Sequence, residues 1–294
     1  MEGVIQDIVN ALSFGSLYAL FALGIALIFG VMSLVNFAHG SLIVAGAIAV
    51  TLMNGQPFIL ILLVTLAAPI ALALAIERLG FRSIRSAPPA TLLVTSFAIS
   101  FMLQNIALMA MGTVPRGANP STFLQKQVHI GGAVVSMLSI VTVIVTLVLL
   151  AVLGLLLART RIGIAMRAAA EDFRMARLLG VRADAIVGLA FAMSGLLAGV
   201  AALLLEAQTG TFTVDMGLFP VLIGFVAAVL GGTGSLVGAV LGGFLLGAGS
   251  VALQILLPAD GKVYRNSIVF AVVLAVMVVR PQGIIVARSQ ARRV

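Results

Sequence analysis

Cysteine is absent from this chain of 294 residues, which excludes disulfide bonds, thiol catalysis and palmitoylation. Tryptophan is absent too and tyrosine occurs twice, so few residues remain for aromatic belts at the faces of a membrane. Charged residues make up 9% of the chain, whereas soluble globular domains average about 25%. Because 62% of the residues are hydrophobic, the charges are too few to cover a water-facing surface, and we expect a polytopic membrane protein.

Catalytic and metal-binding motifs are missing as well. The sequence has no HExxH motif, no Walker A loop and no nucleophile elbow. Its two histidines, His39 and His129, are fewer than a histidine-based metal site needs. We therefore expect no enzymatic activity, no metal and no cofactor bound by this chain itself.

Long apolar runs predict the fold. About 20 apolar residues span a bilayer, and the run over 8–31 is too long for the core of a signal peptide. Glu2 and Asp7 stand where a cleavable signal would carry positive charge, so we expect this run to remain as the first span. The other apolar segments lie at 41–53, 58–76, 90–111, 137–157, 185–206, 218–257 and 267–279. We predict an all-α, polytopic transmembrane helical bundle of about eight or nine segments, forming a single domain over 1–294.

Two of these apolar regions are interrupted. Residues 33–40 separate the first two segments, and the sequence GGTGS over 231–235 divides the run that begins at residue 218. The stretches that follow the breaks, 39–46 and 233–238, resemble each other weakly. Paired broken helices in the two halves of a transporter often flank the translocation path. Short matches of glycine and serine also arise by chance in glycine-rich chains, which is the alternative.

The basic residues predict the orientation. Four of the 17 fall in segments predicted to be external, and the others lie in 77–89, in 159–184 and in the tail from residue 280. Arginine and lysine near membrane spans mark the cytoplasmic side. We therefore predict an external N-terminus, a cytoplasmic C-terminus and a long external loop over 112–136. Basic residues grouped at the ends of apolar runs indicate topology rather than nucleic-acid binding.

The loop over 159–184 contains six arginines, yet its middle is typical of a helix near 166–179. Apolar residues recur there at helical spacing, and Gly180 supplies a helix stop. The stripe consists of Met166, Ala169 or Ala170, Phe173 and Ala176. Such a stripe could lie on the membrane surface or press into another protein. The alternative is a solvated loop whose arginines only fix the topology.

The interiors of the predicted spans contain almost no ionisable residue. Carriers driven by protons or sodium commonly keep ionisable residues inside their spans. We therefore expect the driving force to come from an ATPase partner that docks on the loop over 159–184. Sodium held by carbonyl and hydroxyl oxygens alone is the alternative.

Polar residues within the spans are candidates for a substrate path. In 90–111, Ser96, Ser100 and Gln104 recur every four residues and share one helix face, with Asn105 beside them. They could line a water-filled path or form hydrogen bonds between helices.

Three further residues lie at the ends of predicted segments. Asn36 and His39, at the first interruption, could line the path or cap free backbone groups, and we favour capping. Glu206 could meet substrate or extend to the external interface, and we favour the interface. Glycines spaced four apart, such as Gly195 and Gly199 or Gly243 and Gly247, predict closely packed helices.

Four blocks of sequence carry a family resemblance. They are GSLYAL over 15–20, VNFAHG over 35–40, RIGIAMRA over 161–168 and GGTGSLVG over 231–238. Because of these four blocks, the chain resembles the permease subunits of bacterial branched-chain amino-acid ABC importers. Its length and its acidic N-terminus are similar to the shorter of the two permease types.

The resemblance implies a location in the bacterial inner membrane and a set of partners. These are a second, homologous permease, two cytosolic ATPases that bind the ATP, and an external solute-binding protein. It also implies a coupling helix in the cytosolic loop, followed by a glycine that Gly180 matches. The candidate coupling residues are Arg167, Ala170, Glu171, Asp172, Phe173, Ala176 and Gly180. Similar permeases move urea, short amides or aromatic acids, so the substrate stays open.

Overall fold

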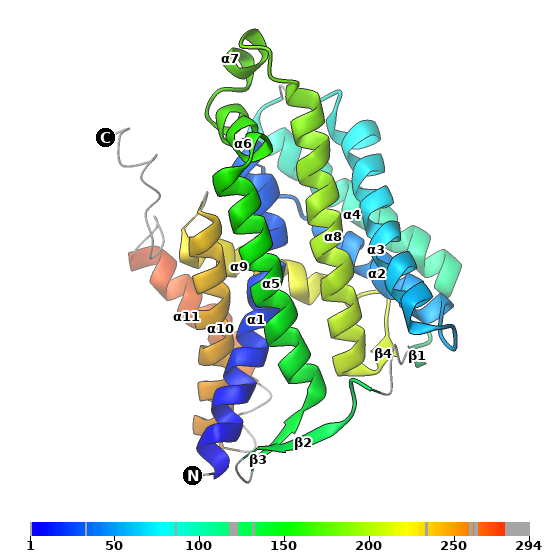
Figure 1. Ribbon diagram of the computed structural model, residues 1–294, viewed down its shortest axis with the longest axis vertical. Coiled ribbons are helices and arrows are strands. Elements are labelled where there is room, and N and C mark those ends of the chain that lie inside the picture. The colour runs from blue at the N-terminus through cyan, green and yellow to red at the C-terminus, as the bar shows by residue number, and fades with distance from the viewer. Residues whose placement is uncertain are drawn as a thin grey trace. The chain divides into compact units, whose positions relative to one another are not determined.

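The computed structural model describes residues 2–32, 34–85, 87–117, 123–130, 133–232, 235–258, 261 and 264–279. Helices dominate these residues, as predicted (Figure 1). The helices are α1 (Glu2–Met32), α2 (His39–Leu52), α3 (Phe58–Ala75), the short π-helical segment η1 (Ile76–Phe81), α4 (Pro89–Met111), α5 (Met137–Arg159), α6 (Arg161–Glu171), α7 (Phe173–Leu178), α8 (Ala183–Thr209), α9 (Leu218–Gly231), α10 (Leu236–Leu256) and α11 (Arg265–Val279). The strands are β1 (Arg116–Gly117), β2 (Gln127–Ile130), β3 (Ala133–Ser136) and β4 (Thr211–Phe212).

Within the described ranges, six helices are long and apolar enough to cross a membrane. They are α1, α3 with η1, α4, α5, α8 and α10. The shorter apolar helices α2 and α9 lie next to the two predicted interruptions, which the structure confirms as breaks in the helices. At the second break Gly232 has a φ of +110°, and Ser235 Oγ caps α10 by accepting from Gly238 N at 3.0 Å.

The chain divides into two compact units. Unit 1 comprises Met1–Ala26, Thr122–Leu147 and Leu222–Val294, and unit 2 comprises Leu27–Ser121 and Val148–Val221. No change of composition marks these boundaries in the sequence, which is why we predicted one domain over 1–294.

Unit 2 is built on close contacts among α2, α3 and α8. A Cβ atom on Gly195 would lie 2.7 Å from the Pro69 carbonyl oxygen, and one on Gly199 would lie 2.7 Å from that of Thr65. The absence of a side chain therefore lets the backbones of α8 and α3 approach each other closely. Gly46 has the same role where α2 meets Ala202 of α8. The packing role predicted for Gly195 and Gly199 is confirmed.

Unit 1 uses glycines in the same way. Gly247 of α10 approaches the backbone of Gly15 in α1, and Gly243 approaches that of Ala19. Gly224 of α9 packs against the backbone of Phe21, where an added Cβ would lie 2.8 Å from the carbonyl oxygen. The predicted packing role of Gly243 and Gly247 is therefore also confirmed.

The single helix predicted near 166–179 is wrong, because the chain forms two helices there. Thr160 begins α6 by accepting from Gly163 N at 3.2 Å. Asp172 then adopts an extended backbone (φ −152°, ψ 104°), and its carboxylate accepts from Met175 N at 2.9 Å, so it caps α7. The helix stop at Gly180 is confirmed, with a φ of +85°.

The loop predicted over 112–136 contains strands that the sequence did not reveal. In unit 1, β2 and β3 form an antiparallel hairpin in which Gln127 pairs with Ser136. In unit 2, β1 pairs with β4, so that Arg116 lies opposite Phe212. Residues 118–122 and 131–132 of this loop lie outside the described residues.

Candidate functional site

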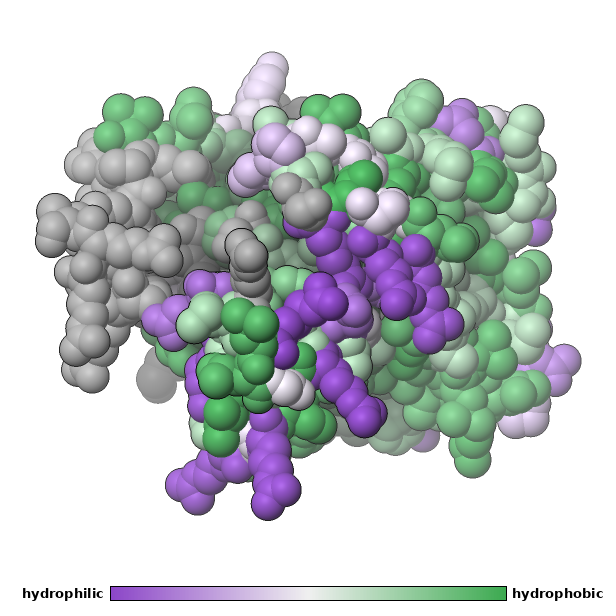
Figure 2. Space-filling view, turned by 90° about the horizontal axis from the view of Figure 1, so that it is seen from above, coloured by the Kyte–Doolittle hydropathy of each residue, from purple (hydrophilic) through white to green (hydrophobic). Residues whose placement is uncertain are grey.

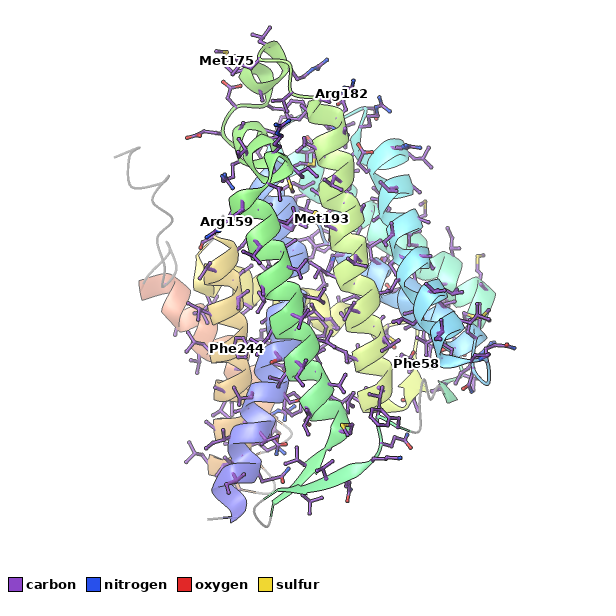
Figure 3. The ribbon with its side chains drawn as sticks, in the orientation of Figure 1. Phe58, Arg159, Met175, Arg182, Met193 and Phe244 are labelled. Carbon is purple, nitrogen blue, oxygen red and sulfur yellow. The ribbon has the colours of Figure 1, made fainter. Side chains whose placement is uncertain are left out.

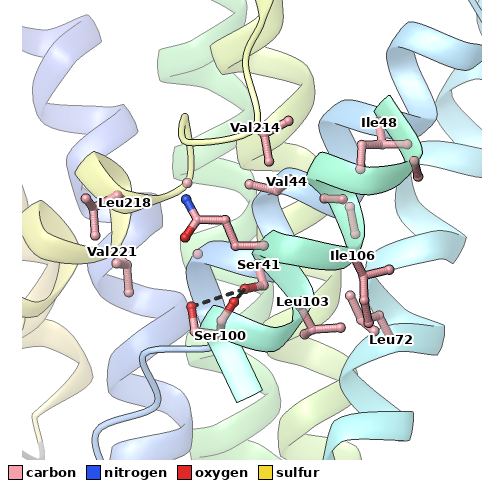
Figure 4. Close-up of a pocket in the computed structure, with 16 residues that line it drawn as sticks. Ser41, Val44, Ile48, Leu72, Ser100, Leu103, Ile106, Val214, Leu218 and Val221 are labelled. Atoms are coloured by element: carbon pink, nitrogen blue, oxygen red, sulfur yellow. Dashed lines mark hydrogen bonds between the residues drawn. The ribbon is translucent and has the colours of Figure 1, made fainter. Parts of the chain in front are cut away.

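Unit 2 contains a cavity of about 270 Å³, which we call the inner pocket (Figure 4). Residues from α2, α4 and the segment 214–221, with Leu72 of α3, line it. None of these described lining residues is charged, and most are aliphatic. Gly40 allows α2 to begin directly beside the loop, since a Cβ there would lie 2.6 Å from the Gly217 carbonyl oxygen. The pocket is close to the lower limit of about 300 Å³ for small-molecule sites.

Three polar side chains line the inner pocket, namely Ser41, Ser100 and Gln104. Ser41 Oγ lies 3.2 Å from Ser100 Oγ and also donates to the Ser100 carbonyl oxygen at 3.4 Å, which ties α2 to α4 (Figure 4). Gln104 lies one turn further along α4. The structure thus brings together two of the three residues that we expected on this helix face.

Ser96, the third residue, has a different role. It is fully buried, and its hydroxyl accepts from Phe37 N at 3.3 Å. Its hydroxyl is also within donating distance of the carbonyl oxygens of Leu93, at 2.7 Å, and Val35, at 3.3 Å. Ser96 therefore satisfies backbone groups at the break between α1 and α2, and its partners there lie in the connection and not on a second helix.

A second cavity of about 390 Å³, the outer pocket, shares Gln104 and Val214 with the inner one. Asn105 also lines it, while its side chain donates to the Phe101 carbonyl oxygen at 2.8 Å. The other polar groups come from Thr113, Thr213 and Asp215, which were not predicted from the sequence. The sequence shows only that these three residues lie in short polar connections next to apolar runs, which does not identify them as pocket residues.

Asn36 and His39 are wholly buried at the break between α1 and α2. The Asn36 side-chain oxygen accepts from Ala38 N at 3.1 Å, so the capping interpretation of Asn36 is confirmed. A hydrogen bond of 3.0 Å joins His39 Nδ1 to Ser194 Oγ, which ties the start of α2 to α8.

The expectation that Glu206 extends to the external interface is wrong. Its side chain is 0% exposed, and neither carboxylate oxygen has a hydrogen-bond partner in the described part of the chain. Because α8 continues to Thr209, Glu206 lies within the helix and not at its end, where we expected it.

Replacing Glu206 with methionine is expected to raise the free energy of unfolding by about 1–3 kcal/mol, because it removes an unpaired buried polar group. Thermal unfolding of the purified protein measures this. Glu171→Met is the control, since Glu171 is exposed on α6 and its loss should change little. A less stable Glu206→Met protein would show that the carboxylate has a stabilising partner.

A third cavity, of about 510 Å³, lies in unit 2 where α1 ends and α8 begins, and we call it the basic pocket. Arg82, Arg85 and Arg177 line it, together with Asp184. The others are Val31, Met32, Ser83, Ala169, Ala170, Phe173 and Val187. The predicted coupling residues Ala170 and Phe173 therefore face this cavity.

Arg85 forms the central ion pairs of this region. Its guanidinium contacts Glu77 of η1 and lies 2.5 Å from Asp184 at the start of α8. Burial lowers the pKa of Arg85, and the Asp184 carboxylate opposes that shift. The guanidinium stays charged near neutral pH because an arginine side chain is not deprotonated in proteins. These pairs connect the loop after η1 to the loop that contains α6 and α7.

The apolar stripe predicted on the loop packs inside unit 2. Met166, Ala169 and Ala176 are buried. A different apolar face is exposed on and just after α7, where Met175, Leu178 and Leu179 are 53%, 75% and 80% exposed. Figure 3 labels Met175 on α7. Of the other candidates, Arg167 donates to the Leu157 carbonyl oxygen, whereas Glu171 and Asp172 are exposed. The sequence pattern thus identified the buried side of these helices.

Long apolar helices, an uncharged pocket among them and an arginine-rich loop at one end are the features of an integral-membrane permease. The chain belongs to the family described as the permease component of branched-chain amino acid transport systems, whose sequence model matches residues 7–279.

Individual proteins similar to this chain are permeases too. The chain is 35% identical to the high-affinity branched-chain amino acid transport permease BraD of Pseudomonas aeruginosa, over 96% of this chain and 95% of BraD. It is 30% identical to LivH of Escherichia coli, a permease of the same description, with the same coverage. The autoinducer 2 import permease LsrC of Escherichia coli is 34% identical, over 45% of this chain and 40% of LsrC. No solved structure matches the chain.

Proposed function

We propose that this chain is the transmembrane subunit of an ATP-driven importer for branched-chain or related hydrophobic amino acids. Its near full-length similarity to BraD carries the proposal. The inner pocket supports it, because aliphatic side chains there would suit an apolar substrate side chain while Gln104 and Ser100 offer polar contacts. The partners would be a homologous permease, two cytosolic ATPases and an external solute-binding protein. The chain would have eight or nine segments in the inner membrane, some of them interrupted, with its N-terminus outside and its C-terminus in the cytoplasm.

Uptake of radiolabelled leucine into proteoliposomes that hold the assembled importer tests this function. With ATP inside the vesicles and the binding protein outside, labelled leucine should accumulate. An excess of unlabelled isoleucine or valine should reduce this uptake. Competition by urea, short amides or aromatic acids instead would favour the related importers. Uptake by the purified chain alone, driven by an ion gradient without ATP, would identify a secondary carrier.

The path would run through the outer and inner pockets, which meet at Gln104. A cysteine at Gln104 is expected to react with a hydrophilic maleimide, and leucine should slow the reaction. The native chain has no cysteine, so it contributes no background. Asn36→Cys is the control and should not react, because Asn36 is 0% exposed. Equal labelling of both positions, or no protection at Gln104, would contradict this path.

The loop over 159–184 would couple the ATPases to the spans through α7. Its exposed face of Met175, Leu178 and Leu179 has no partner within the described part of the chain, and apolar contact of this kind is typical of protein interfaces. The buried residues Met166, Ala169 and Ala176, with the half-buried Phe173, would transmit the movement to α8. Gly180 would let the chain turn between them.

A further inference from the structure

The basic pocket is formed by segments that are far apart in the sequence. The end of α1, the loop after η1, the helices α6 and α7 and the start of α8 all contribute side chains. Figure 2 looks onto the end of the molecule that carries α6 and α7, and it shows hydrophilic side chains gathered beside apolar ones. A cavity of about 510 Å³ is large enough for a small molecule or a lipid headgroup.

The charges that face this cavity are not balanced. Arg85 is compensated, because it pairs with both Glu77 and Asp184. Arg82 and Arg177 line the same cavity, and neither forms an ion pair with any described residue. Two exposed guanidinium groups from different segments therefore face one cavity, and neither is in an ion pair with the carboxylate of Asp184 that also lines it.

The chemistry of the lining points to the ligand. Guanidinium groups bind phosphate oxygens through paired hydrogen bonds. The three arginines and the two carboxylates at this cavity leave one net positive charge, which matches the single negative charge of a phosphodiester. The rest of the lining is largely apolar, with Val31, Phe173 and Val187 among its members. An anion that is soluble in water would gain little from these side chains, whereas the glycerol and upper acyl carbons of a lipid would pack on them.

We propose that the basic pocket binds the phosphodiester headgroup of an anionic phospholipid from the leaflet on the α6–α7 side. Basic pockets between transmembrane helices on the cytoplasmic side are known to take such headgroups. The excess of arginine in 77–89 and 159–184 assigns this end to the cytoplasmic side.

A headgroup held by Arg82 and Arg177 would connect the loop after η1 to α7. Arg85 already joins the same loop to η1 through Glu77 and to the start of α8 through Asp184, so the lipid would add a connection to α7. The lipid would thus stabilise one position of the loop over 159–184, and the lipid composition of the membrane would modulate the stability of the whole chain.

Native mass spectrometry of the purified full-length chain, titrated with phosphatidylglycerol or phosphatidylcholine, tests the proposal. The wild-type chain should bind phosphatidylglycerol in preference. Arg82→Gln with Arg177→Gln should weaken that binding by about 30-fold, from the contribution of two basic residues near an anionic headgroup. The matched control is Arg78→Gln with Arg161→Gln, which removes the same charge from exposed positions that do not line the pocket. It should change the affinity less than about twofold.

Equal losses in the two double variants would overturn the proposal, since the attraction would then be a general effect of charge. Equal binding of the two lipids to the wild-type chain would overturn it as well. A competition experiment adds millimolar inorganic phosphate to the lipid-bound chain. Displacement of phosphatidylglycerol by phosphate would assign the site to a soluble phosphate instead.

Thermal unfolding in detergent without lipid confirms that each variant is folded. A rise in melting temperature on adding phosphatidylglycerol to wild type and control, absent from Arg82→Gln with Arg177→Gln, would support the site.

Discussion

Replacing Gly199 with valine is expected to lower the free energy of unfolding by about 3 kcal/mol, a shift of about 10 °C in melting temperature. The atoms that a Cβ would meet belong to the backbone of α3. They are the Thr65 carbonyl oxygen at 2.7 Å and the Leu66 Cα at 3.1 Å. A side chain at position 199 therefore has to move α3 away from α8, and these two helices form the most extensive contact in unit 2.

Thermal unfolding of the purified variant, with the yield of folded protein from the membrane, measures this effect. Gly154→Val is the matched control, because Gly154 is also within a long helix and a Cβ there would meet nothing within 4 Å. The control should remain within about 0.5 kcal/mol of the wild type. A Gly199→Val protein as stable as Gly154→Val would mean that α3 and α8 are further apart than described.

Replacing Leu178 and Leu179 together with aspartate is expected to weaken the attachment of the ATPases by at least about 30-fold, the effect of losing one strongly contributing interface residue. Leucine uptake by the importer should fall with it. Both side chains are largely exposed, so the chain itself should fold and keep its melting temperature. Substrate should then no longer stimulate ATP hydrolysis.

Ile162→Asp with Ile164→Asp is the matched control, since both side chains are exposed on α6 of the same loop but lie outside α7. It introduces the same charge and should preserve most of the uptake. Normal uptake by the Leu178→Asp and Leu179→Asp variant, with normal stimulation of ATP hydrolysis, would exclude α7 from coupling.

Much of the fold could be predicted because the length of an apolar run determines where a helix lies, and the spacing of glycines determines where a helix can pack closely. Both features can be read from a short stretch of sequence. The segment 90–111 and α4, Pro89–Met111, differ by one residue at the start, since prolines and a glycine bound the apolar run. Gly195 and Gly199 predicted a close helix contact because only the absence of a side chain permits it. The identity of the partner helix, α3, depends on tertiary packing, which spacing alone does not determine.

The site was harder to predict because it depends on which helix face is covered. Met166 and Ala176 form an apolar stripe that the rest of unit 2 covers, whereas Leu178 and Leu179 stay exposed. A sequence pattern identifies apolar residues but not the surface against which each one packs. The break at Asp172 was missed for a related reason, because a run of alanines before it favours one continuous helix.

Glu206 and Asp215 illustrate the same limit for charged residues. Both lie near the end of α8 in the sequence, yet Glu206 is fully buried and Asp215 lines the outer pocket. The sequence gives no sign of this difference, because the burial of a charged side chain depends on the elements that pack against it, and α8 also continues beyond the predicted end at 206.

The central claim is that work reaches the spans through α7 from a subunit that hydrolyses ATP. Photo-crosslinking from position 178 in the assembled importer tests it most directly, with position 144 of α5, also exposed, as the control. The account predicts that a crosslinking residue at 178 attaches to the nucleotide-hydrolysing subunit and that one at 144 does not. An active importer in which position 178 never attaches to that subunit would contradict it.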